Sequence, residues 1–574
     1  PVLDGKPILS WDGVVRPYSA QKNNWADLFQ KSNNTVNNLA FENVSENSST
    51  RFSVTQNHYE GTSLGSKNDR VAINLNSTYK FGSKIRLNVI ATDIWQKVHN
   101  RPYSDDRLIN NFTGMMSPFD NGAWYQNKYQ TSLGYKYVTG SNQSLTPNEN
   151  LKFGNYRTDI LDYMWNVKTS NLDEYNNRLI ASATGFWDIA KNLQFRGRIS
   201  TDWTADKNES ENSSSIPLVY GYSGSYGIGT NNYAILYGDA LLTYTKNIND
   251  DLTLKVMAGY TADKESAYST SISTNGGLTT ENRFDLTSSA NPQYNSSSTR
   301  SYLTKDAYIG TINASYKDYL FVEGTVRSDR TSTMNPLQNS FIYPSVNGSF
   351  VFSDVLKLPE FVNLAKLRAS WGIVGNYPNA YAANVAYNLG NLGNQGSGSS
   401  TLTSTVTTGQ YGNDNIRPEK KHEIEFGLEA GFFNNRVNLD LAYYNNKVVD
   451  MILPLEISQS TGAGSILTNV GTLRNHGVEV ALNGTAIQRR NFTWETGVNF
   501  SFNNNKIEKL TTGSNELIHA DYDGNAAVLK SVVGQPVGDF YAHPIKTDSK
   551  GQPIVNDYGD GTLDYQLDGS KLVK

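Results

Sequence analysis

From about Thr35 to Ile507 the sequence repeats one unit: an extended stretch of roughly ten residues in which apolar and polar side chains alternate, a short polar turn, a second such stretch and a longer polar loop. Successive side chains of a β-strand point to opposite faces. Each stretch therefore predicts a strand with one apolar and one polar face. Short turns that alternate with long loops are typical of β-barrels that cross an outer membrane, with the turns inside and the loops outside.

The split into two faces is clear in single stretches. One predicted strand has an apolar face formed by Leu252, Leu254, Val256, Ala258 and Tyr260. In another, Ile424 and Phe426 alternate with Glu423, Glu425 and Glu429, which places three carboxylates on one face. Carboxylates are too costly to bury in hydrocarbon, so this face must contact water.

Strand length and aromatic placement favour a membrane barrel over a soluble β-sandwich, which would also alternate. A strand that crosses a bilayer needs about 9 to 11 residues, more than the roughly 5 to 6 of soluble strands. Aromatic residues recur beside the short turns, as in the aromatic girdles of outer-membrane barrels. They are Tyr79, Phe81, Phe186, Trp187, Tyr244, Tyr316, Tyr319, Phe350, Phe352, Phe432, Phe433, Phe492 and Trp494. The alternative is the general preference of aromatic residues for strands.

Composition excludes several classes. The 574 residues contain no cysteine, which excludes disulfides, a thiol nucleophile and thiolate metal sites. The sequence contains no run of about 18 apolar residues, so it predicts no membrane-spanning helix. A net charge of −4 gives no indication of a basic patch for nucleic acid. The sequence begins at Pro1 without a leader, so we expect that something precedes it.

We expect about sixteen strands in this sequence. They lie near 36–44, 51–59, 70–80, 84–98, 176–187, 193–204, 232–246, 252–264, 304–317, 319–328, 339–353, 362–375, 419–432, 436–453, 468–485 and 492–507. Turn-forming residues place the inner turns at 188–192, 247–251, Asp318 and Asn434-Asn435. The long outer loops are expected at 99–175, 205–231, 265–303 and 376–418.

Several segments, in this order and spacing, resemble the SusC/RagA-like TonB-dependent transporters of Bacteroidota outer membranes. The sequence reads Val470-Gly-Thr-Leu-Arg-Asn-His-Gly-Val-Glu-Val-Ala-Leu482, then Asn491-Phe-Thr-Trp-Glu-Thr496 and Asn499-Phe-Ser-Phe-Asn-Asn-Asn-Lys506. This is similar to a late hairpin of the family, G-x-x-x-N-x-G-V-E followed by F-x-W and N-x-S-x-N-x-N-K. Further similar segments are Tyr343-Pro-Ser345, Leu367-Arg-Ala-Ser-Trp-Gly-Ile-Val-Gly-Asn376, Asn415-Ile-Arg-Pro-Glu-Lys420 and Val533-Gly-Gln-Pro-Val-Gly-Asp-Phe-Tyr541.

The resemblance implies an all-β transmembrane antiparallel barrel of 22 strands. It also implies an N-terminal plug, a SusD-like surface lipoprotein as a lid, uptake driven by the TonB complex, and assembly into dimers of transporter–lid pairs. About sixteen of those strands are expected here, so we expect a partial chain. Residues 1–34 would connect a missing plug to the barrel, 35–507 would form barrel strands and loops, and 508–574 would be a long extracellular loop region, with the remaining strands absent.

Loop aromatic and amide residues are the candidates for cargo contact, because neutral side chains can bind sugars or peptides reversibly. They are Trp124, Tyr125, Tyr129, Tyr220, Tyr222, Tyr226, Tyr411 and Asn413. The alternative is that these side chains pack loop against loop or against the lid. The sequence does not separate a glycan from an oligopeptide cargo.

Signals for enzymatic or metal chemistry are weak. Gly61-Thr-Ser63-Leu-Gly65 matches G-x-S-x-G, but it lies in a hairpin loop rather than between a strand and a helix. The six histidines have no metal-ligand spacing. Asp557, Asp560 and Asp564 resemble part of a calcium loop but lack its full ladder of ligands, which favours a plain turn. We therefore expect no enzyme and no cofactor.

Two other functions fit parts of the pattern. A passive porin fits the strand count and a polar lumen, and a surface adhesin fits a β-protein without transport. The long tyrosine- and asparagine-rich loops and the ordered family segments favour gated import through an integral outer-membrane protein.

Overall fold

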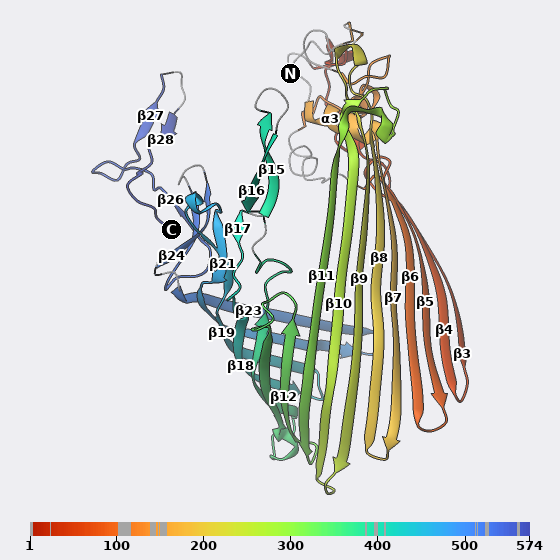
Figure 1. Ribbon diagram of the computed structural model, residues 1–574, viewed down its shortest axis with the longest axis vertical. Coiled ribbons are helices and arrows are strands. Elements are labelled where there is room, and N and C mark those ends of the chain that lie inside the picture. Colours follow the sequence, from red (N-terminus) through yellow and green to blue (C-terminus); the bar gives the residue numbers. More distant parts are fainter. Residues whose placement is uncertain are drawn as a thin grey trace. The chain divides into compact units, whose positions relative to one another are not determined.

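The computed structural model describes residues 4–22, 24–101, 116–137, 145–146, 148–149, 158–384, 387–394, 400–406, 409–510, 513, 515–522, 527–559 and 563–574. Its main feature is a sheet of 16 strands whose neighbours follow one another along the chain (Figure 1). The strands are β3 (Asn33–Val44), β4 (Ser48–Glu60), β5 (Lys67–Phe81), β6 (Ile85–His99), β7 (Ser170–Ala190), β8 (Leu193–Asn212), β9 (Ser225–Asn247), β10 (Leu252–Leu278), β11 (Ser289–Tyr316), β12 (Leu320–Thr331), β13 (Ser340–Val351), β14 (Val362–Asn376), β18 (Glu419–Phe432), β19 (Val437–Val449), β22 (Gly471–Arg489) and β23 (Phe492–Leu510).

The remaining elements are short and lie in the connections. Small sheets are formed by β1 (Pro7–Leu9) with β2 (Val15–Pro17), β15 (Tyr387–Asn394) with β16 (Ser400–Val406), β17 (Gln410–Tyr411) with β20 (Ile452–Glu456) and β21 (Ser465–Asn469), β24 (Glu516–Tyr522) with β25 (Ala527–Val532) and β26 (Asp539–Ala542), and β27 (Val555–Asp557) with β28 (Leu563–Tyr565). The helices are α2 (Gly122–Asn127), α3 (Thr158–Thr169) and the 3-10 turns η1 (Ala26–Leu28), η2 (Leu218–Tyr220), η3 (Leu286–Ser288), η4 (Phe352–Asp354) and η5 (Gln459–Thr461). None of the helices in the described part of the chain has the length and apolar character needed to cross a membrane.

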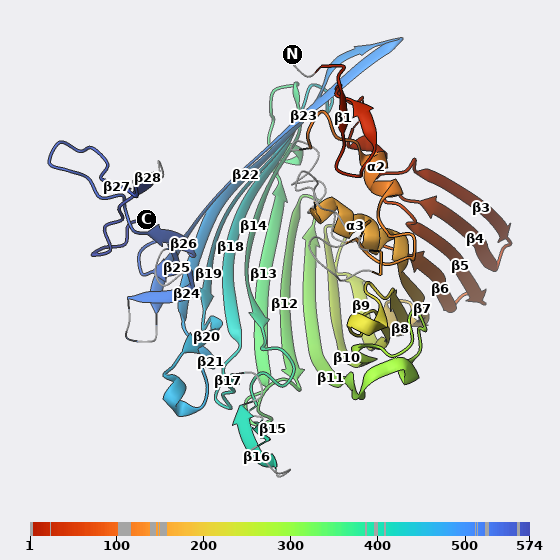
Figure 2. The same cartoon turned by 90° about the horizontal axis from the view of Figure 1, so that it is seen from above.

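The chain divides into two compact units. The first unit comprises 1–187, 196–238 and 263–302, and in it α3 lies at the end of the strands where the long connections are (Figure 1). The second unit comprises 188–195, 239–262 and 303–574, and in it β12, β13, β14, β18, β19 and β22 follow one another side by side (Figure 2).

Strand pairing in the second unit aligns the apolar residues into rows. Leu367 on β14 pairs with Leu428 on β18, which pairs with Leu441 on β19. The next row toward the long-loop end contains Phe426 and Tyr443. Leu367 is 50 % exposed and Phe426 54 % exposed, so this face is not covered by the chain itself. The apolar face therefore lies open along the strands, as the alternation predicts.

The predicted turns and girdle residues lie at one end of the sheet. Phe433, Asn434 and Asn435 join β18 to β19 and adopt left-handed backbone conformations, with φ of 56°, 58° and 60°. Asp318, in the turn between β11 and β12, adopts the same conformation with φ of 58°. Asparagine and aspartate tolerate this conformation better than most residues. The predicted girdle residues whose rings are exposed at this end are Tyr79, Phe81, Trp187, Tyr244, Tyr316, Phe433, Phe492 and Trp494.

Several predicted boundaries are wrong. The expected loops 205–231 and 265–303 are mostly strand. In the first, β8 continues to Asn212 and β9 begins at Ser225; in the second, β10 continues to Leu278 and β11 begins at Ser289. Serine-, threonine- and asparagine-rich segments lack an apolar face, yet their backbones still pair in the sheet. The expected strand 468–485 is divided, since Ser465–Asn469 pairs in a small sheet and β22 begins at Gly471.

The long connections also contain more structure than expected. The predicted loop 99–175 holds α2 and α3, and β7 begins at Ser170. Residues 4–22 and 24–32 pack against this connection, and their predicted link to a plug stays a prediction. The segment 508–574 carries two small sheets, β24–β26 and β27–β28.

A lysine on the apolar face should destabilise the protein in a bilayer more than a lysine on the polar face. Phe500→Lys places a charge among exposed apolar side chains, whereas Asn499→Lys places it on the opposite face of the same strand. On the lipid face of a transmembrane β-barrel, a lysine in the middle of the hydrocarbon lowers the free energy of unfolding by about 2–4 kcal/mol. Unfolding by denaturant in lipid vesicles should show that loss for Phe500→Lys and little change for Asn499→Lys. Equal effects would contradict the assignment of faces.

Candidate functional site

The polar face of the second unit carries a network of ion pairs centred on Arg368 of β14. Its Nη1 lies 2.9 Å from Glu429 Oε1, its Nη2 3.0 Å from Asp440 Oδ1, and its Nε 3.4 Å from Glu425 Oε1. Lys366 Nζ lies 3.3 Å from the same Glu429 oxygen. The network therefore joins β14, β18 and β19 across the face opposite to Leu367.

A glycine makes room for this network. A Cβ added to Gly427 of β18 would lie 2.3 Å from Arg368 Nε and 2.6 Å from its Cγ. Arg368 thus crosses β18 over a residue without a side chain, and its guanidinium reaches Asp440 on the next strand. The predicted carboxylate row is therefore charge-compensated: Glu425 and Glu429 pair with Arg368, and Glu423 pairs with Lys421. This arrangement suits a hydrated wall rather than acid–base catalysis.

The connections of the first unit enclose an apolar cluster. Its buried members are Trp11, Leu28, Met116, Tyr125, Ile160, Leu161 and Met164. The ring of Tyr125 lies 4.5 Å from that of Trp11, and both side chains donate to the buried Asp120, at 2.6 Å from Tyr125 and 3.2 Å from Trp11. Gly122 sits against Leu28, where a Cβ would lie 2.8 Å from its backbone nitrogen. The cluster gives the long connection a rigid core.

Trp124 lies at the border of this cluster. The Arg16 guanidinium stacks over its ring at 4.1 Å and also binds both carboxylate oxygens of Asp12, at 2.6 and 2.7 Å. Burial raises the pKa of Asp12, but the hydrogen bonds and charge of Arg16 outweigh burial and hold that pKa below its usual value. The ion pair holds the Arg16 guanidinium over the indole ring of Trp124.

A second group of loop residues presents exposed aromatic side chains around η2. Val219, Tyr220 and Tyr222 are 73 %, 46 % and 57 % exposed. Glu281 holds this turn from the neighbouring loop, because it accepts the Leu218 N–H at 3.0 Å and the Tyr135 hydroxyl at 2.7 Å. That hydroxyl bond, together with burial, raises the pKa of Tyr135.

The backbone beside Tyr222 is equally fixed. Gly277 has φ of +99°, and a Cβ there would lie 2.7 Å from both Ser223 N and the Tyr222 carbonyl carbon. Ser214 N donates to Asn282 Oδ1 at 2.8 Å. We define the η2 platform as Val219, Tyr220 and Tyr222 on this interlocked support. It offers two aromatic rings to solvent at little further cost in conformational entropy on binding.

The other predicted contact residues have different surroundings. Tyr125 is fully buried, Tyr129 packs against the apolar cluster, and the mostly buried Tyr226 donates to Glu209 at 2.6 Å. In the second unit, Tyr411 donates to the Thr461 carbonyl at 2.6 Å, and Asn413 accepts the Asn415 N–H at 2.9 Å. For Tyr125, Tyr226 and Tyr411 these contacts follow the loop-packing alternative; the role of all eight residues in cargo binding stays a prediction.

The structure describes two of the three residues of the calcium candidate. Asp557 Oδ1 accepts the Gly559 N–H at 2.8 Å, Asp564 lies in β28, and Asp560 falls outside the described residues. No group of three His, Asp or Glu side chains suited to a metal ion occurs in the described ranges. Ser63 of the G-x-S-x-G segment is buried in the connection between β4 and β5.

Sequence reasoning missed the residues that support both loop groups. Asp120 and Trp11 are 109 positions apart, and Tyr135 and Glu281 are 146 apart. Each is a single polar or aromatic residue in an irregular segment, and only the tertiary contact identifies it. Pro, Gly and Asn near these segments signal a loop but not its partner.

Comparison with known proteins gives consistent matches. The family model described as "TonB dependent receptor-like, beta-barrel" matches residues 10–539. TonB-dependent receptor P26 of Formosa agariphila is 28 % identical over 360 residues, which is 60 % of this chain and 35 % of that protein. TonB-dependent receptor SusC of Bacteroides thetaiotaomicron is 28 % identical over 273 residues, which is 45 % of this chain and 27 % of that protein.

A solved structure shares the fold. The RagAB peptide transporter matches with a TM-score of 0.74 at 17 % identity, covering 96 % of this chain and 59 % of the other. The matched region spans about a third or less of the length of the curated relatives.

Replacing Gly427 should test the polar network. Gly427→Ala is expected to lower the free energy of unfolding by about 1–3 kcal/mol, because the methyl group displaces Arg368. In an Arg368→Ala background the same substitution should have little effect. Gly324→Ala is the matched control, since a Cβ there meets nothing within 4 Å. Equal losses from Gly427→Ala in both backgrounds, measured by denaturant unfolding, would disprove the steric explanation.

Proposed function

The chain belongs to the TonB-dependent receptor-like β-barrel family, and we propose that it is the barrel part of an importer for a glycan or an oligopeptide. The importer is integral to the bacterial outer membrane and takes its energy from the TonB complex. The observation that carries the proposal is the η2 platform, which exposes Tyr220 and Tyr222 at the long-loop end of the strands. In such barrels that end faces the cell exterior.

The chemistry of the platform fits a neutral, bulky cargo. Tyrosine rings offer an apolar face to the C–H groups of a sugar or a peptide, and the hydroxyl groups add hydrogen bonds. Because Glu281, Asn282 and Gly277 already fix the loops, binding does not require them to become ordered. Trp124, held by Arg16, is a second candidate surface in the same unit.

The polar face of the second unit also supports the proposal. Ion pairs such as Arg368–Glu429 and Lys366–Glu429 give a hydrated wall whose charges are mostly compensated. Such a wall lets a neutral cargo pass without trapping it electrostatically. We further propose a SusD-like lipoprotein as a lid and assembly as dimers of transporter–lid pairs, as the resemblance to the SusC/RagA group implies.

Removing a platform ring should weaken cargo binding without changing the fold. Tyr222→Ala is expected to reduce affinity for the cargo roughly tenfold, because stacking of a ligand on one aromatic ring typically contributes of the order of 1 kcal/mol or more. Tyr79→Ala, an exposed tyrosine at the short-turn end of β5, is the matched control. Calorimetric titration with glycan and peptide fractions measures the cargo affinity of both variants. Unchanged affinity for Tyr222→Ala would remove the platform from the binding site.

Uptake by cells tests the class of function. In a strain that lacks the gene, the wild-type gene should restore uptake of the cargo, and collapse of the proton gradient should abolish it. Uptake that persists without the gradient would instead identify a passive porin. A deletion strain with normal uptake but reduced surface attachment would identify an adhesin.

A further inference from the structure

The apolar face of the second unit ends in a row of basic side chains. Toward the long-loop end of β19, β22 and β23, Tyr443, Val478 and Phe502 form one row, as the strand register shows. Asn445, His476 and Asn504 form the next row. The row beyond consists of Lys447, Arg474 and Lys506, which pair with one another across the three strands. The same face thus changes from apolar to amide and imidazole and then to cationic over a few residues.

A β-bulge adds one carboxylate to this basic row. Thr472 pairs with Lys509 and Leu473 with Ile507, so Glu508 is an extra residue in β23. A bulge re-aims the side chain that it carries. Glu508 Oε2 lies 2.9 Å from Lys447 Nζ, and Glu508 Oε1 lies 3.4 Å from Arg474 Nη1. These ion pairs orient the two basic side chains. Three basic side chains face one carboxylate, and the row keeps an excess of positive charge.

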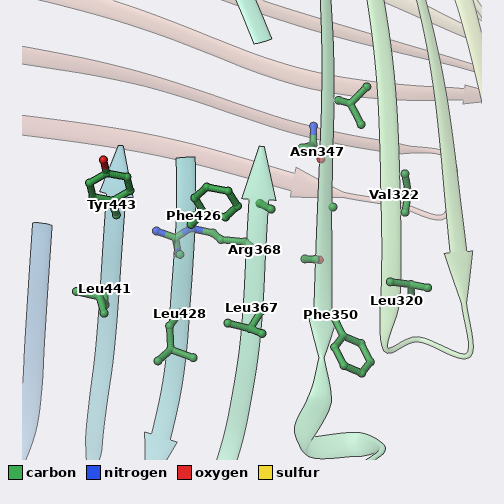
Figure 3. A pocket seen from close by; sticks show the side chains of 15 residues that line it. Leu320, Val322, Asn347, Phe350, Leu367, Arg368, Phe426, Leu428, Leu441 and Tyr443 are labelled. Atoms are coloured by element: carbon green, nitrogen blue, oxygen red, sulfur yellow. The ribbon is translucent and has the colours of Figure 1, made fainter. Parts of the chain in front are cut away.

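Two hollows lie on this face of the sheet. A polar hollow of about 640 Å³ is lined by residues that include Tyr443, Asn445, Arg474, His476, Lys506 and Glu508. An apolar hollow of about 700 Å³ is lined by residues that include Phe350, Leu367, Phe426, Leu428 and Leu441 (Figure 3). Tyr443 belongs to both hollows.

The apolar hollow exists because two small residues interrupt an apolar row. Val322 pairs with Gly348, Gly348 with Ala369, and Ala369 with Phe426. Larger side chains surround this gap: Figure 3 shows Leu367, Leu428 and Leu441 in one row and Phe426 and Tyr443 in the next. A Cβ on Gly348 would meet only Phe321 O, at 3.6 Å. The gap is therefore not required by the packing of the sheet.

We propose that this bipartite groove is a binding site for a phosphate-bearing lipid of the outer leaflet. The phosphate would lie on Arg474 and Lys506, with His476 beside it, and an acyl chain would run past Tyr443 into the hollow over Gly348. Charge complementarity favours an anionic headgroup, and the adjoining apolar hollow favours an acylated molecule over a free anion. The long-loop end faces the cell exterior, which places the basic row at the outer leaflet.

The inference rests on the outer-membrane placement proposed above and adds a specific lipid to it. The bound lipid would contact β22 and β23 through its phosphate, and β13, β14, β18 and β19 through its chain. It would thereby reinforce the wall across six strands.

Native mass spectrometry of the purified protein in neutral detergent tests the site. The probes are bacterial lipid A and the same lipid with its phosphates removed. Lipid A is expected to bind and the dephosphorylated form to bind roughly thirtyfold more weakly, as loss of contacts to two basic residues would produce. Arg474→Gln with Lys506→Gln should reduce lipid A binding by a similar factor. The matched control is Arg489→Gln with Arg490→Gln, which removes two exposed charges at the opposite end of the same two strands.

A second variant tests the chain end of the groove. Gly348→Leu should fill the apolar hollow and weaken lipid A binding while the denaturant midpoint stays unchanged. Equal lipid A binding by the wild type, the Arg474/Lys506 double variant and Gly348→Leu would overturn the proposal. So would inorganic phosphate that competes fully with lipid A. Failure to bind either lipid, with no stable insertion into vesicles, would instead refute the membrane placement itself.

Discussion

The hydrogen bonding of the backbone is the constraint on which the rest of the structure depends. A peptide group left unpaired in hydrocarbon costs several kcal/mol, so a chain in a membrane must pair every N–H and C=O within itself. The sheet meets this requirement along its inner strands, each of which pairs with a neighbour on both sides, whereas β3 and β23 form its two edges. Short turns suffice at one end, and the other end is free to carry long connections. Binding surfaces can therefore vary in those connections without disturbing the wall.

Regular pairing also produces two chemically different faces, and both carry detail beyond the alternation. On the polar face, the absence of a side chain at Gly427 lets Arg368 reach across β18 to Asp440. On the apolar face, Gly348 opens a hollow that leads toward the basic row of Lys447, Arg474 and Lys506. In each case a glycine in a strand marks the place where something else, a side chain or a proposed lipid, occupies the space.

The sequence predicted what depends on local pattern and missed what depends on distant contact. Alternation gave the number of strands, the two faces of β14, β18 and β19, and turns such as Asn434-Asn435. It did not give the extension of β10 to Leu278, because the serine- and threonine-rich end of this strand has no apolar face to recognise. Nor did it give α3 or the Asp120 contacts, since a buried aspartate among aromatic residues from remote segments leaves no periodic signal.

Site-directed spin labelling along β22 tests the central claim most directly. The 574 residues contain no cysteine, so each introduced cysteine carries the only label in this sequence. In vesicles, labels at 478, 480 and 482 should be reached by oxygen dissolved in the lipid, and labels at 479, 481 and 483 by a water-soluble nickel complex. We expect the ratio of oxygen accessibility to nickel accessibility to alternate with a period of two residues along β22. Uniform accessibility along the strand, or labels at 478–482 sealed from both reagents, would contradict the account of one face in lipid and one in water.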